Sequence, residues 1–185
     1  MSLLSLWLPI LLSAALVFVA SAIIHMVLGY HRRDFKKMPD EDQVMEALRK
    51  FAIPPGEYLV PCAEGSRSMK DPTFLEKMTK GPVLVMTVRQ SGPPRMAAGL
   101  AQWFLYCVVV SIFAAYVASR AVAPGAGYLQ VFRFAGATAF LGYAMALWQS
   151  SIWYKRPWIT TLKLTFDGLI YGLLTAGTFG WLWPR

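Results

Sequence analysis

The chain has 185 residues, of which 56% are hydrophobic, 14% are aromatic and only 15% are charged. Its mean hydropathy of +0.45 is too high for an ordinary water-soluble domain, so the composition predicts an integral membrane protein. The formal net charge of +8 would suit nucleic-acid binding, but the basic residues lie beside hydrophobic runs, where they act as topology signals and contact anionic headgroups. We therefore expect the lipid bilayer as a partner, and no nucleic acid.

Four apolar stretches are long enough to cross a hydrocarbon core of about 30 Å, which takes roughly 20 residues. They cover residues 4–29, 97–119, 128–149 and 158–183. No Lys or Arg precedes Arg32, so the first stretch lacks the charged n-region of a signal peptide and is interpreted as a retained anchor. The predicted fold is membrane all-α: four transmembrane helices with a small α+β insert, residues 30–96, between helices one and two.

The distribution of Lys and Arg predicts the orientation, because these residues are retained on the cytoplasmic side. Three segments on one side carry Arg32, Arg33, Lys36, Lys37, Arg89, Arg95, Lys155 and Arg156. The other side carries only Arg120 and Arg185. This pattern predicts a multi-pass membrane protein with both termini outside the cytoplasm and the insert cytoplasmic. Two aromatic belts agree with this orientation: Trp7, Tyr116, Tyr128, Trp181 and Trp183 on the outer side, and Tyr30, Trp148, Trp153, Tyr154 and Trp158 on the inner side.

The insert is predicted to contain two helices and two strands. Asp40 has the look of an N-cap with Gln43 as its capping-box partner, and the helix that follows ends before Pro54. Residues 56–60 suggest a strand, 71–81 a helix with Pro at its first position and Gly at its end, and 82–89 a second strand that pairs with the first. The insert has too little apolar content in about 65 residues to be very stable alone, so we expect it to pack against the membrane surface or a partner.

Helix four carries a ridge of small residues at intervals of four, namely Gly168, Gly172, Ala176 and Gly180. Such a ridge lets another helix approach closely. On helix three, we expect the face with Thr138, Gly142 and Ala146 to pack against this ridge. We interpret the ridge as packing between helices three and four; the alternative is a homodimer face.

Asp167 is the one acidic residue inside the predicted spans, where an ionisable group is costly and is a functional candidate by default. Its expected partners are Lys163 and Tyr171, each one turn away, and Arg133 on helix three. The simplest interpretation is a buried ion pair or hydrogen bond that locks helices three and four together. The alternatives are a proton or ion relay, and a carboxylate that is solvated near the interface.

His25 is the other polar candidate inside a span, with Ser21 one turn before it. A histidine can shuttle protons or bind metal, but the nine methionines form no repeated motif that would support a copper site. We expect His25 to hydrogen-bond to Ser21 or to a backbone carbonyl.

The sequence predicts no metal site, no cofactor and no catalytic residue. The chain contains no CxxC and no HxxxH, and its two cysteines, Cys62 and Cys107, fall in different predicted compartments. The loop with Cys62, Glu64, Ser66 and Ser68 holds potential nucleophiles, but His31 is the one histidine outside the spans that could act as their base.

Five short motifs follow the first apolar stretch and its basic flank in a fixed order: Pro-Asp-Glu-Asp at 39–42, Pro-Pro-Gly-Glu-Tyr at 54–58, Asp-Pro-Thr-Phe-Leu-Glu-Lys at 71–77, Gly-Pro-Val at 81–83 and Asp-Gly-Leu-Ile-Tyr at 167–171. This order resembles uncharacterised bacterial inner-membrane proteins. The resemblance implies a location in a bacterial inner membrane, with both termini periplasmic or outside, and brings no activity, cofactor or residue role.

The favoured function is a non-enzymatic accessory or scaffold subunit whose basic cytoplasmic insert docks a partner or the anionic leaflet. Its partner would be another membrane protein or a homo-oligomer. The first alternative is a small oligomeric transporter or channel component that uses Asp167. The second is a membrane-embedded enzyme acting on lipid, which would need convergent titratable groups at the inner interface.

Overall fold

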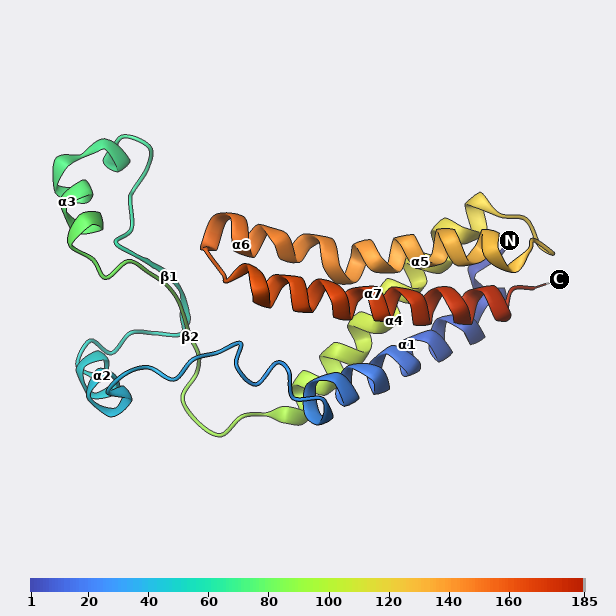
Figure 1. Cartoon of the computed structure of the whole chain (residues 1–185), viewed down its shortest axis with the longest axis horizontal. Coiled ribbons are helices and arrows are strands. Elements are labelled where there is room, and N and C mark those ends of the chain that lie inside the picture. Colours follow the sequence, from blue (N-terminus) through green and yellow to red (C-terminus); the bar gives the residue numbers. More distant parts are fainter. Residues whose placement is uncertain (185) are drawn as a thin grey trace. The chain divides into compact units, whose positions relative to one another are not determined.

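The computed structural model describes residues 1–184; Arg185, predicted to lie on the outer side, is outside the described residues. The chain divides into two compact units (Figure 1). The helical unit comprises residues 1–35 together with the segment from residue 95 onward, and the insert unit comprises residues 36–94.

The helical unit contains four long helical segments. The first consists of a 3₁₀ turn, Leu3–Leu6, then α1, Trp7–Ala22, and a π-helical turn, Ile23–Val27. The second is α4, Met96–Ala121. The third runs from α5, Tyr128–Ala144, through the 3₁₀ turn Met145–Leu147 into α6, Trp148–Tyr154, and the fourth is α7, Trp158–Trp181.

Three of the four segments are long and apolar enough to cross a membrane: Leu3–Val27, Met96–Ala121 and Tyr128–Tyr154. These helices are compatible with a multi-pass membrane protein. The fourth segment, α7, is 24 residues long but is not one of the three. It carries two charged residues, Lys163 and Asp167, and several threonines.

The four segments form an antiparallel bundle in which each packs on two neighbours. The α1 helix contacts α4 and α7, and α5 contacts the same two helices from the other side. Leu6, Val131, Phe179 and Trp183 share a buried cluster, so the two termini lie at the same end of the bundle (Figure 1). The turn between α4 and α5 joins them there, since the Gly125 amide donates to the Pro184 carbonyl at 2.9 Å.

The small-residue ridge of α7 lies against α5. A Cβ added at Gly168 would come 2.8 Å from the Ala144 Cβ, and one added at Gly172 would come 3.2 Å from the Phe140 Cβ. At the other end of the ridge, a Cβ at Gly180 would come 2.7 Å from the Tyr128 ring. The ridge is therefore covered by α5 within one chain and is not free to form a homodimer face.

The residues of α5 that contact the ridge differ from those predicted. Gly136, Phe140 and Ala144 face α7, whereas Gly142 faces α4, where an added Cβ would come 3.1 Å from Val110. Position 142 is two residues beyond 140, which places it about 200° further around the helix. The predicted face of Thr138, Gly142 and Ala146 therefore belongs to a different side of α5.

The insert unit is a hairpin with two short helices. Its elements are α2, Glu41–Arg49; β1, Gly56–Val60; a 3₁₀ turn, Ser68–Lys70; α3, Pro72–Lys80; and β2, Leu84–Val88. The strands pair antiparallel with Gly56 opposite Val88 and Val60 opposite Leu84, as predicted.

The predicted signals for α3 are confirmed. The Asp71 carboxylate accepts a hydrogen bond from the Thr73 amide at 2.7 Å, Pro72 is the first helical residue, and Gly81 follows the last turn with φ +62°. The hydrogen bonds from Thr73 hold the pKa of Asp71 below its usual value.

The predicted capping box of α2 is wrong. Asp40 precedes the helix but has left-handed backbone angles, φ 46° and ψ 44°, and its side chain caps no amide. An N-cap side chain reaches the first-turn amides from extended backbone angles, so the left-handed conformation removes the cap.

Replacing Gly168 with Leu should destabilise the bundle by about 1–3 kcal/mol, because the new side chain would overpack the contact with Ala144. The matched control is Gly99→Leu in α4, where an added Cβ meets nothing within 4 Å. Thermal unfolding of both variants in mild detergent measures the difference. Equal melting temperatures for the two variants would contradict the close packing.

Candidate functional site

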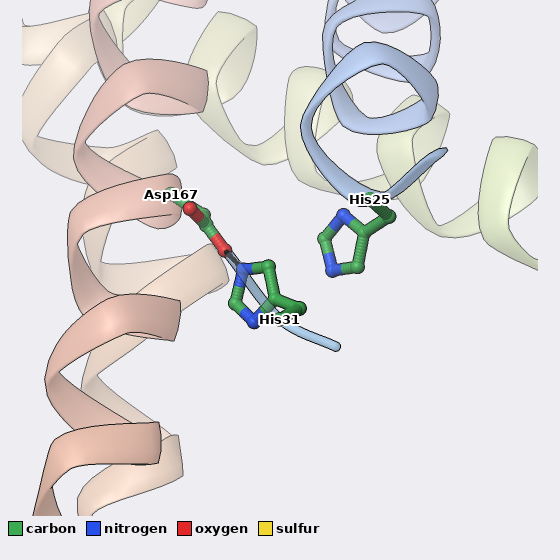
Figure 2. A group of neighbouring side chains, drawn as sticks. All are labelled: His25, His31 and Asp167. Carbon is green, nitrogen blue, oxygen red and sulfur yellow. Dashed lines mark hydrogen bonds and ion pairs between the residues drawn. The ribbon is translucent and has the colours of Figure 1, made fainter. Parts of the chain in front are cut away.

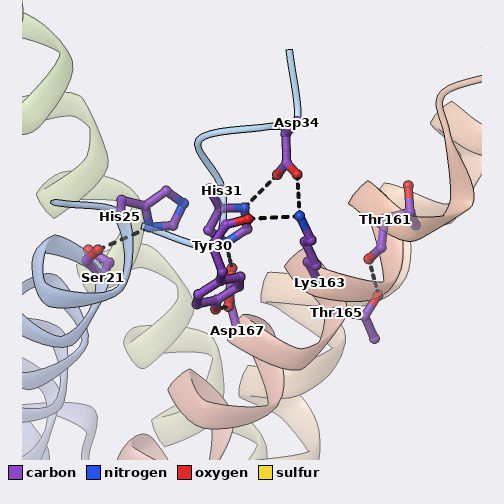
Figure 3. Close-up of polar contacts among 9 residues, drawn as sticks. All are labelled: Ser21, His25, Tyr30, His31, Asp34, Thr161, Lys163, Thr165 and Asp167. Carbon is purple, nitrogen blue, oxygen red and sulfur yellow. Dashed lines mark hydrogen bonds and ion pairs between the residues drawn. The ribbon is translucent and has the colours of Figure 1, made fainter. Parts of the chain in front are cut away.

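The end of α1 turns back toward α7 through an unusual backbone. His25 lies in the π-helical turn Ile23–Val27, and Gly29 follows with φ +66°, a left-handed conformation that favours glycine. The turn brings Tyr30, His31 and Asp34 beside Lys163 and Asp167 of α7 (Figure 3). These five residues are called the polar cluster below.

Asp167 is the innermost member of the polar cluster and is only 1% exposed. Its two carboxylate oxygens have separate donors: the Tyr30 hydroxyl donates to Oδ1, and His31 Nε2 donates to Oδ2 at 2.8 Å. Both donors come from the segment after α1. Asp167 therefore locks that segment to α7, and not helix three to helix four as expected.

A second carboxylate, Asp34, forms the outer half of the polar cluster. His31 Nδ1 donates to Asp34 Oδ2 at 2.6 Å, and Lys163 Nζ donates to Asp34 Oδ1 at 2.7 Å and to the Tyr30 carbonyl at 2.8 Å. Burial disfavours the charged carboxylate, but the hydrogen bonds from Lys163 and His31 outweigh it and lower the pKa of Asp34. Burial, reinforced by the hydrogen bond to Asp167, raises the pKa of Tyr30, so its hydroxyl keeps its proton.

Two carboxylates hold the ring of His31. Its Nδ1 lies 2.6 Å from Asp34 Oδ2 and its Nε2 lies 2.8 Å from Asp167 Oδ2, so the ring bridges the two acidic residues. Lys163 completes the polar cluster by pairing with Asp34.

Among the described residues, Asp167 forms no hydrogen bond or ion pair with the three partners that were predicted for it. Lys163 pairs with Asp34 instead. Arg133 lines a groove between α5 and α7 beside Gly172, further along the bundle than Asp167, and forms no hydrogen bond or ion pair within residues 1–184. The Tyr171 ring packs on Trp103 and Tyr143, and its buried hydroxyl has no partner among the described residues.

His25 hydrogen-bonds to a carbonyl, as its position predicted, with Nδ1 3.0 Å from the Ser21 backbone oxygen. Its exposed ring stacks on His31, with the centroids 4.6 Å apart and the planes 3° from parallel. His25, His31 and Asp167 lie close enough for one ligand atom of each to fall within 4.8 Å of the others (Figure 2).

Sequence reasoning missed Tyr30, His31 and Asp34 as partners of Asp167. The sequence did contain one signal for these contacts. Gly29 can reverse the direction of the chain, and His31 and Asp34 follow it at a spacing of three residues.

Comparison with protein-family models, with curated proteins and with solved structures finds no match to the chain. Its function therefore has to be inferred from its own geometry.

Asp167→Leu should destabilise the chain by about 2–5 kcal/mol, because it leaves the Tyr30 hydroxyl and the His31 ring without the carboxylate that both contact. Arg133→Leu is the control: a residue without a hydrogen bond at this site should change stability by no more than about 0.5 kcal/mol. Thermal unfolding in detergent distinguishes the two. A larger loss for Arg133→Leu would restore Arg133 as the partner of the buried carboxylate.

Proposed function

We propose that the chain spans a bacterial inner membrane four times, with α7 as the fourth span and both termini on the outer side. The antiparallel bundle supports this topology because α7 packs along α1 and α5, which are both apolar enough to cross. The end of the bundle away from the termini carries Arg32, Arg33, Lys155 and Arg156, the charge pattern of a cytoplasmic face.

Exposed aromatic side chains support the same placement. Trp7 and Trp181 are exposed at the end that holds the termini, and Trp153 and Trp158 are exposed at the opposite end. Trp183 departs from the predicted outer belt: it is buried and donates to the Ala123 carbonyl at 3.0 Å.

We infer that the protein is a non-enzymatic accessory or scaffold subunit whose insert unit docks a cytoplasmic protein. The observation that carries this proposal is that no side chain in residues 36–94 is buried. Apolar residues on both helices and both strands are uncovered, including Leu48, Leu59, Leu75 and Val85, and Phe51 is 73% exposed. Exposed apolar surface on this scale is typical of an interaction site.

The hairpin offers a partner both side chains and backbone. Alternation along the paired strands places Tyr58, Val60, Leu84, Met86 and Val88 on one wholly apolar face. Each strand also has one edge without a neighbour in the two-stranded sheet. An isolated two-stranded sheet is marginal in water, and open edges accept a further strand.

The charge of the insert favours a protein over the anionic leaflet. Residues 36–94 contain nine Lys and Arg and eight Asp and Glu, a net charge of only +1. Several basic residues that the sequence analysis assigned to the insert belong to the helical unit in the structure, namely Arg32, Arg33 and Arg95. We therefore expect a partner that supplies a β-strand and an apolar surface.

The transporter alternative has less support. Both carboxylate oxygens of Asp167 are held by donors from Tyr30 and His31. A carboxylate held in this way is typical of a structural lock, whereas a relay needs a group that exchanges partners.

A membrane-impermeant maleimide should label Cys62 only after the cells are permeabilised, because this exposed thiol lies in the proposed cytoplasmic insert. Cys107 is buried and should stay unlabelled throughout. In a Cys62→Ser background, Pro124→Cys in the turn at the terminal end should be labelled in intact cells. Labelling of Cys62 in intact cells would reverse the proposed orientation.

A photo-crosslinking amino acid at Leu84, on the apolar face of the hairpin, should give one discrete protein adduct in living cells. The same group at Glu64, an exposed polar loop position of the insert, should give none. Met86→Lys, which places a charge on the apolar face, should abolish the Leu84 adduct. No adduct, or equal adducts at both positions, would contradict the docking proposal; an adduct of twice the chain mass would identify a second copy in place of a separate partner.

A further inference from the structure

We propose that His25, His31 and Asp167 form a binding site for a divalent transition-metal ion where α1 ends beside α7. One ligand atom from each residue lies within 4.8 Å of the other two, and Asp167 is buried (Figure 2). The site is independent of the docking surface, because all three residues belong to the helical unit.

The backbone is shaped to bring the two histidines together. They are six residues apart, a spacing that a regular helix would not place on one face. The π-helical turn holds His25, and Gly29, with φ +66°, reverses the chain so that His31 returns beside it. This local geometry explains why a search for HxxxH finds no site.

His25 presents a free ligand atom. Its Nδ1 lies 3.0 Å from the Ser21 carbonyl, which only accepts, so Nδ1 carries the proton. The lone pair of the neutral ring is therefore on Nε2. Metal-binding histidines are commonly oriented in this way, by donating the other ring N–H to a backbone carbonyl or carboxylate.

His31 and Asp167 have the same kind of support. His31 donates from Nδ1 to Asp34, which is held in turn by Lys163. A carboxylate behind an imidazole fixes the ring and increases its basicity as a ligand. Tyr30 holds Oδ1 of Asp167, and Oδ2 is directed at His31 Nε2. Each of the three ligands therefore has an outer partner that orients it.

The charge of the site favours a cation. The carboxylates of Asp34 and Asp167 lie beside one lysine, Lys163, which pairs with Asp34. Oδ2 of Asp167 lies 2.8 Å from His31 Nε2, so a carboxylate oxygen and an imidazole nitrogen already meet at one point. A metal ion that binds here displaces any proton shared by these two atoms to solvent, as ligand protons are released when metals bind.

Binding requires one local adjustment. The rings of His25 and His31 are parallel, so their lone pairs must tilt toward a common point. His25 can make this change because its ring is exposed and its one hydrogen bond is to a carbonyl of its own helix.

Two imidazoles and one carboxylate suit Zn²⁺ and other first-row divalent ions. Three protein ligands also leave a coordination position open for water or another small ligand. The proposed site therefore has the donor set of an exchangeable or reactive metal centre, whereas a closed structural zinc site uses four protein ligands.

Zinc binding by the full-length protein tests the proposal. The chain is purified in detergent with a tag that contains no histidine, stripped with EDTA and titrated with Zn²⁺ in competition with a chromophoric chelator; Co²⁺ then reports the geometry by its visible spectrum. We expect one ion per chain and a rise in melting temperature with Zn²⁺. His25→Ala should weaken binding by about 100-fold or more. Asp34→Asn, which weakens the support of His31 and removes the ion pair with Lys163, should weaken binding by about tenfold.

His25→Ala keeps the test decisive, because its exposed ring contributes nothing to the buried hydrogen bonds and the variant should melt like the metal-free protein. Cys62→Ala is the control for binding at an exposed thiol and should bind zinc like the wild type. Absence of stoichiometric binding, binding unchanged by His25→Ala, or binding lost in Cys62→Ala would each overturn the proposal.

Discussion

The burial of Asp167 is the constraint on which the rest of the helical unit depends. An ionised carboxylate inside an apolar bundle is several kcal/mol unfavourable unless charged or polar donors surround it. Here the donors come from Tyr30 and His31, so the segment after α1 has to fold back onto α7. The π-helical turn and the left-handed Gly29 follow from this requirement, because a regular helix end would carry His31 away from the bundle.

The same requirement determines where the chain leaves the bundle. Asp34 is held by His31 and Lys163, and the insert unit begins two residues later at Lys36. The bundle buries small residues such as Ala114, Ala135 and Ala139 in close helix contacts, whereas residues 36–94 bury none of their side chains. The chain therefore joins a well-packed membrane unit to an insert whose apolar surface needs another molecule to cover it.

Much of the fold could be predicted from the sequence, because the signals are local. Apolar runs of about 20 residues indicated the long helices, the interval of four between Gly168 and Gly172 indicated close packing, and Asp71 with Pro72 indicated the start of α3. The packing face was predicted wrongly where one helix contacts two neighbouring helices. Gly142 faces α4 because α5 packs on both α4 and α7, and only the three-dimensional arrangement assigns each face.

The contacts of the polar cluster could not be predicted from the sequence for a different reason. Helical periodicity proposed Lys163, Tyr171 and Arg133 as partners of Asp167, since it considers only neighbours on regular helices. The real donors stand in an irregular segment more than 130 positions away, and Lys163 contributes through Asp34. The charges of residues 31–37 give information that helical periodicity does not. Asp34 is the one acidic residue in this otherwise basic segment, which indicates a specific partner for its carboxylate. His31 is that partner, because Asp34 holds the ring against Asp167 whether a proton or a metal ion lies between them.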